Sequence, residues 1–119
     1  MLPQPGEVTS IAADVYETKT EIVVEMELPG VIERDIKVLL FAGRVEVSGF
    51  KRGAPAHDGS RFLRLEREFG AFRREVAVPA AFDADRARAV LANGLLTITL
   101  RKPPSRTRAV SIKPRRAEE

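Results

Sequence analysis

The sequence predicts a single all-β domain, an antiparallel β-sandwich. Short segments in which apolar and polar residues alternate recur at roughly ten-residue spacing, and Gly, Pro or Asn-Gly separates them. A chain of 119 residues is long enough for one modest core but not for two. We therefore place the sandwich at residues 11–102, between a short N-terminal arm at 1–10 and a flexible C-terminal extension at 103–119.

The first half of the domain contains four predicted strands. Their apolar residues recur with a period of two, which is typical of half-buried strands. The second of them should end at Pro29-Gly30, and Ala42-Gly43 should turn the third into the fourth, with a break at Gly49. The four segments are 11–16, 21–28, 36–40 and 45–49.

The second half ends in a strongly patterned hairpin. A strand is predicted over 72–78 and should stop at Pro79. Asn93-Gly94 predicts a tight turn into a strand over 95–100. In that last strand Leu, Ile and Leu alternate with two threonines, so one face should be buried and the other wet.

Residues 80–94 fit two patterns. Asp83 could cap a helix and Ala and Arg follow it, so local propensity favours a helix. The spacing of Ala87, Ala89 and Leu91 fits a strand equally well. Because sheet context outweighs propensity, we expect a helical turn near 83–86 that runs into a strand at 87–92.

Charge separates the tail from the body. Residues 101–119 hold seven Lys or Arg and two Glu, a net +5, whereas the remaining hundred residues carry a net −2. Such a tail could neutralise nucleic-acid phosphates, or it could be a solvated extension that keeps an assembly soluble. Because aromatic stacking residues are missing from it, we expect no nucleic-acid partner.

The composition favours an interaction protein over an enzyme. His57 is the sole histidine and cysteine is absent, so a metal site is not expected. The serines lie in no nucleophile-elbow context, and no Gly-x-Gly spacing is available to cradle a phosphate. We therefore predict no catalytic residues and no cofactor. No long apolar run or signal peptide is present, and we expect a cytoplasmic protein without a membrane partner.

A series of motifs, in order along nearly the whole chain, resembles the α-crystallin domain of the small heat-shock proteins. Each motif alone is a common β pattern, and their order and separation carry the resemblance. They are D-V-Y-E-T at 14–18, E-L-P-G-V at 27–31, D-I-K-V at 35–38, V-E-V-S-G at 45–49, E-R-E-F-G-A-F-R-R at 66–74 and A-V-L-A-N-G-L-L-T-I-T-L at 89–100.

The resemblance implies an immunoglobulin-like sandwich that dimerises. It also implies an ATP-independent chaperone, a holdase that binds partly unfolded proteins through apolar grooves and prevents their aggregation. The alternative is a non-catalytic protein-interaction or co-chaperone module with the same sandwich. Such modules generally lack the arginine-bearing strand, the long loop and the tail motif described next.

Two features of the resemblance concern the dimer. Arg74 matches the family's arginine in the pattern that continues to Val78-Pro79, where it supports the dimer interface; the alternative is an exposed strand arginine, as we expect for Arg73. The loop between Gly49 and Phe69 is long for a hairpin. In bacterial members such a loop carries a strand that pairs with the partner's sheet, and here the candidate interface residues are Phe62, Leu63, Arg64 and Leu65. The alternative is a loop folded onto its own sheet.

The third feature is the tail motif Val110-Ser111-Ile112, which matches the family's Ile/Val-x-Ile/Val motif. In the family this motif docks between the fourth and eighth strands of a neighbouring subunit, and side chains at i and i+2 can fill two adjacent pockets. The groove residues here would be Ile36, Val38, Ala87 and Ala89. Only about ten residues precede Ile11, fewer than in most members. We therefore expect a homodimer, or a small assembly linked by tails.

Overall fold

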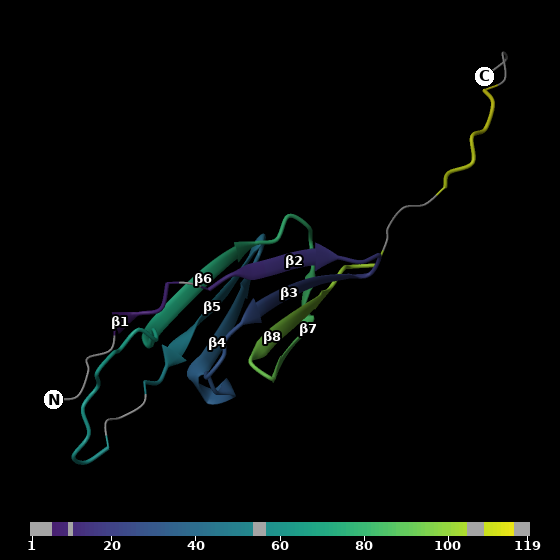
Figure 1. The fold of residues 1–119 in the computed structure, drawn as a ribbon. Coiled ribbons are helices and arrows are strands. Elements are labelled where there is room, and N and C mark those ends of the chain that lie inside the picture. The colour runs from purple at the N-terminus through teal and green to yellow at the C-terminus, as the bar shows by residue number, and fades with distance from the viewer. Residues whose placement is uncertain (1–5, 10, 54–56, 105–108, 116–119) are drawn as a thin grey trace.

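The computed structural model describes residues 6–9, 11–53, 57–104 and 109–115. Two four-stranded sheets pack against each other as two layers (Figure 1), with strand orders β1-β6-β5-β4 and β2-β3-β8-β7. Every strand pair is antiparallel except β1 with β6. The predicted antiparallel β-sandwich is therefore confirmed. No helix among the described residues has the length and apolar character needed to cross a membrane.

The elements follow the sequence pattern closely. One short 3₁₀ turn, η1, precedes β4. The bounds are β1 Gly6–Glu7, β2 Ala13–Glu17, β3 Glu21–Glu27, η1 Glu33–Asp35, β4 Ile36–Phe41, β5 Arg44–Lys51, β6 Gly70–Ala77, β7 Asp83–Ala92 and β8 Leu95–Arg101.

The two predicted tight turns are confirmed. Ala42-Gly43 joins β4 to β5, with Gly43 at φ 82°, and Phe41 lies opposite Arg44. Asn93 and Gly94 both have positive φ, 52° and 77°, as a two-residue hairpin turn requires. β5 does not break at Gly49 as predicted but continues to Lys51. Glycine is used there for space, because a Cβ would lie 2.7 Å from the Phe72 ring.

The helical turn predicted at 83–86 is wrong, because β7 is a strand from Asp83 onward. Asp83 lies opposite Arg101 and Arg88 lies opposite Thr99. Between these two pairs β7 has four residues where β8 has one, so β7 bulges here. The Asp83 side chain accepts a hydrogen bond from the Asp85 backbone N–H at 3.0 Å. The local preference of aspartate for turns is thus expressed as a bulge within the strand rather than as a helix.

Gly6 and Glu7, which we placed in the short N-terminal arm, form β1. They lie opposite Gly70 and Ala71 of β6, and the Val8 N–H donates to the Ala71 carbonyl at 2.9 Å. A Cβ on Gly70 would run into the Gly6 carbonyl oxygen, so glycine is what lets β1 approach β6.

The core lies between the two sheets and is formed by the side chains that point inward from their strands. Val24, Val45 and Leu100 are fully buried. Burying an aliphatic side chain of this kind contributes about 1.5–3 kcal/mol. The buried set is Ile22, Val24, Met26, Leu28, Val31, Val45, Val47, Phe72, Val76, Val78, Leu96, Ile98 and Leu100.

Candidate functional site

The sandwich is open along two sides, and the predicted site residues on the sheets lie at these sides. β4 and β7 are the edge strands of the two sheets on one side, which we call the β4–β7 side. On the other side β2 is an edge strand, and β1 covers only the beginning of β6. We call this second opening the β2–β6 side.

Inward-facing side chains of the β4–β7 side remain incompletely covered. Val38 lies opposite the buried Val47, so it faces the interior, yet it is only half-buried. Ala89 lies opposite Ile98, which is 1% exposed, and so also faces inward, but Ala89 itself is exposed. The side chains at 36 and 87 are half-buried against the core. The four predicted groove residues thus lie on the two facing edge strands.

A hollow of about 510 Å³ lies at one end of the β4–β7 side. It is bordered by the β4–β5 turn and by the connection from β6 to β7. Its apolar lining includes Leu40, Phe41, Val78, Pro79, Ala80 and Phe82. The predicted groove residues are not part of this lining, and neither Leu40 nor Phe82 was predicted as a groove residue. The period of two that selected Ile36 and Val38 also selects Leu40.

Arg74 lies at the β2–β6 side. Its position alternates with the buried Phe72 and Val76, so by strand parity it belongs to the inner face of β6, yet it is exposed. Its Nη1 donates to the Glu75 carbonyl at 3.2 Å, and within the described residues it makes no ion pair. Across the opening, Val15 of β2 also faces inward, opposite Val24, and is 40% exposed. An unpaired arginine and an uncovered valine therefore border this side.

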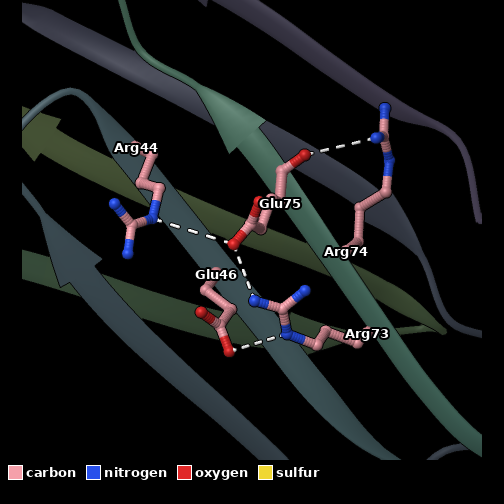
Figure 2. A network of polar contacts seen from close by, with 5 residues as sticks. All are labelled: Arg44, Glu46, Arg73, Arg74 and Glu75. Atoms are coloured by element: carbon pink, nitrogen blue, oxygen red, sulfur yellow. Dashed lines mark hydrogen bonds and ion pairs between the residues drawn. The ribbon is translucent and has the colours of Figure 1, made fainter.

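Arg73 belongs to a different surface, the outer face of β5 and β6 (Figure 2). Glu46 and Glu75 lie directly opposite each other, a pairing of like charges that disfavours the sheet. Arg73 offsets it by contacting Glu46 at 3.1 Å and Glu75 at 2.6 Å, and Arg44 lies 3.8 Å from Glu75. The hydrogen bonds to Glu46 and Glu75 raise the pKa of Arg73. Figure 2 shows Arg74 projecting from the opposite side of β6.

The long loop presents its apolar residues to solvent. Phe62, Leu63 and Leu65 are 42%, 87% and 48% exposed, and residues 57–69 form no strand in the single chain. Arg64 pairs with Glu66 at 3.2 Å. The loop begins and ends at paired residues of adjacent strands, because Lys51 lies opposite Gly70. The two ends of the loop are therefore paired within the sheet, while its apolar segment extends into solvent.

The base of this loop is fixed by an ion pair that predicts a pH effect. Arg52 donates to both carboxylate oxygens of Asp35, at 2.7 and 3.1 Å, and these hydrogen bonds hold the pKa of Asp35 below its ordinary 3.8. The ion pair stabilises the folded chain at pH values above the pKa that Asp35 has in the unfolded state. This stabilisation is lost as the pH falls through the lower pKa that Asp35 has in the folded state. Arg52→Gln should raise the pKa of Asp35, as measured by carboxyl NMR titration.

The matched control is Arg34→Gln, because Arg34 lowers the pKa of Asp35 through a weaker charge interaction alone. It should raise that pKa less than Arg52→Gln does. An Asp35 pKa that is the same in wild type and Arg52→Gln would contradict the role of Arg52.

The tail motif is uncovered on its own chain. Val110 is 74% and Ile112 is 94% exposed, and residues 109–115 form no strand. Across the described residues, no group of three or more His, Cys, Asp or Glu side chains could hold a metal ion. The predicted site residues among the described residues lie on exposed apolar segments and on open sides of the sheets.

Comparison with known proteins identifies the family to which this chain belongs. The model of the Hsp20/alpha crystallin family matches residues 14–114. Spore protein SP21 of Stigmatella aurantiaca is 44% identical over 93 residues, which cover 78% of this chain and 55% of that protein. The chain thus spans little more than half the length of this relative.

Solved structures agree in fold. Heat shock protein 16.0 from Schizosaccharomyces pombe superposes with a TM-score of 0.73 at 35% identity and covers 89% of this chain and 100% of that one. A small heat-shock protein from Xylella fastidiosa, described as having a distinct high order structure, gives a TM-score of 0.71 at 26% identity, over 89% and 98% of the two chains. The chain belongs to the Hsp20/alpha crystallin family, the small heat-shock proteins.

Proposed function

We propose that this protein is an ATP-independent holdase of the cytoplasm that binds partly unfolded proteins under stress and keeps them from aggregating. The observation that carries the proposal is the β4–β7 side, where inward-facing apolar residues such as Val38 and Ala89 are incompletely covered. Membership of the small heat-shock proteins supports a stress-related chaperone role.

The physical requirement for a holdase is modest. An unfolded segment exposes alternating apolar side chains and unpaired backbone groups. An open sheet edge can pair with that backbone, while pockets between the sheets take every second side chain. Binding of this kind lowers the concentration of aggregation-competent chains by mass action and needs no nucleotide. The apolar hollow of about 510 Å³ next to this edge adds room for a larger side chain.

We propose further that two copies form a homodimer by exchanging the long loop. Phe62, Leu63 and Leu65 are apolar side chains with little cover from their own chain, and Arg64 lies among them. Leu65 is five residues and Phe62 eight residues from Gly70, a reach of up to about 26 Å for extended chain. The unpaired edge of β2 is the partner surface that fits, since pairing there would also cover Val15.

Arg74 fits the same interface. It stands at the β2–β6 side without an ion pair among the described residues, so its charge is available to a carboxylate or carbonyl of the partner. Val110 and Ile112 are proposed to dock at the β4–β7 side of another copy, which would link dimers and shield that side until stress exposes it.

The holdase activity is tested by heating a thermolabile model enzyme with and without the protein, in the absence of ATP, while light scattering is followed. We expect equimolar protein to reduce scattering by at least about half, because each client segment needs one open side. A heat-stable protein of the same size serves as the control. Scattering that matches this control up to molar excess would argue for the co-chaperone module instead.

A further inference from the structure

We infer that Lys102 is the positioning residue of the C-terminal tail. It fastens the start of the tail, just after β8, to the β2–β3 turn. It thereby directs Val110 and Ile112 to the β4–β7 side of another copy instead of the β4–β7 side of their own chain. This inference rests on the proposed docking of the tail at the β4–β7 side.

The root of the tail lies where two paths are open. Arg101, the last residue of β8, has Glu21 of β3 on one side and Asp83 of β7 on the other. Neighbouring strands are about 4.8 Å apart, so the edge strand β7 is next to the root. A tail that turned toward β7 would reach the β4–β7 side of its own chain.

Length does not prevent such self-docking. Val110 is eight residues further along the chain than Lys102, and extended chain of that length reaches up to about 26 Å. A strand of the length of β7 spans a comparable distance. The direction in which the tail leaves the sheet therefore decides which groove it meets.

Lys102 sets this direction through three contacts, two with the β2–β3 turn and one with the end of β2. Its backbone N–H donates to the Thr20 carbonyl at 2.9 Å, and its Nζ donates to the Thr18 carbonyl at 2.8 Å. The same Nζ lies 2.8 Å from Glu17 Oε2, and the lysine side chain is only 24% exposed. The turn is itself braced, since Thr18 Oγ1 accepts from the Glu21 N–H at 3.0 Å.

The two residues that follow carry the direction outward. Pro103 and Pro104 have fixed φ angles, and a residue before proline is confined to extended conformations. Lys102 to Pro104 therefore form a stiff spacer whose first residue is tied down on the side away from β7. In Figure 1 the chain leaves the sandwich at this end, beside the β2–β3 turn.

The test uses the full chain and its lack of cysteine. Cysteines introduced at Ala109 in the tail and Asp85 on β7 are labelled with a donor and a quenching acceptor that exchange energy only near contact, because Ala109 always stays within about 25 Å of Lys102. The labelled protein is diluted into a large excess of unlabelled protein, so that energy transfer reports docking of a tail on its own chain. The variants are Lys102→Met, which keeps the aliphatic stem, and Lys102→Arg, which keeps the charge.

Transfer should be low in wild type and in Lys102→Arg. In Lys102→Met the self-docked fraction should rise by about two- to fivefold, the range expected for losing one ion pair. Adding Val110→Ala/Ile112→Ala to Lys102→Met should abolish the rise. The unfolding temperature should be the same in all variants, because a merely structural role of Lys102 would move it.

Two results would overturn the inference: transfer that stays low in Lys102→Met, or a rise that persists when Val110 and Ile112 are replaced. Failure of the underlying docking is seen separately. If Val110→Ala/Ile112→Ala in the unlabelled protein leaves the mass of an assembly larger than a dimer unchanged, tail docking and the inference are both wrong.

Discussion

Leu100→Ala is expected to lower the free energy of unfolding by about 2–5 kcal/mol, the range for truncating a buried leucine. Leu100 is fully buried, lies opposite Ile22 on β3, and projects from the central strand β8 into the core. Neighbouring strands on both sides limit how far the cavity can collapse. Urea denaturation followed by circular dichroism measures the change as a shift in midpoint.

Thr97→Ala is the matched control on the same strand. Thr97 lies opposite Glu25 and faces the outer surface, so its truncation should change the free energy of unfolding by less than about 1 kcal/mol. Equal destabilisation by the two substitutions would contradict the assignment of inner and outer faces on β8.

Phe62→Ser/Leu63→Ser/Leu65→Ser is expected to convert the dimer into a monomer. The three side chains are exposed on the single chain, and burying each against a partner would contribute about 1.5–3 kcal/mol. Their loss should raise the dissociation constant at least about a thousandfold. Molar mass from multi-angle light scattering across a concentration series measures this change.

The control for this prediction is Val90→Ser, which removes an exposed apolar side chain from the outer face of β7, 54% exposed. It should leave the mass unaltered. If the triple variant keeps the wild-type dissociation constant, the loop is not exchanged.

Much of the fold was accessible from the sequence because its signals are local. Asn93-Gly94 and Ala42-Gly43 specify two-residue turns by their backbone conformation, and those turns fix the register of both hairpins. Once register is fixed, the period of two decides which side chains face inward. That Val38 and Ala89 face inward follows from this parity, whereas their place on edge strands follows from the strand order.

Other features depend on contacts between distant segments. β1 forms because Gly70 leaves room for the Gly6 carbonyl, and nothing in the arm itself indicates a strand. Asp83 resembles a helix cap locally, but pairing opposite Arg101 holds it in a strand. Phe82 was missed because it lies between elements, where strand parity gives no guidance.

The same limit applies to charge. Strand parity places Arg73 and Arg74 on opposite faces of β6, but it does not say which of the two forms ion pairs. Arg73 bridges Glu46 and Glu75 on the outer face, whereas Arg74 stands at the open side. The family pattern selected Arg74 for the interface, and the structure adds that its charge is not satisfied by an ion pair among the described residues.

Site-directed photo-crosslinking from neighbouring positions of β7 tests client binding at the β4–β7 side most directly. Ala89→Cys and Val90→Cys, each labelled with a benzophenone maleimide, place the same probe one residue apart on opposite faces of the sheet. With a heated client and no ATP, we predict client adducts from position 89 at several times the yield from position 90. Equal yields from the two positions would contradict binding in this groove.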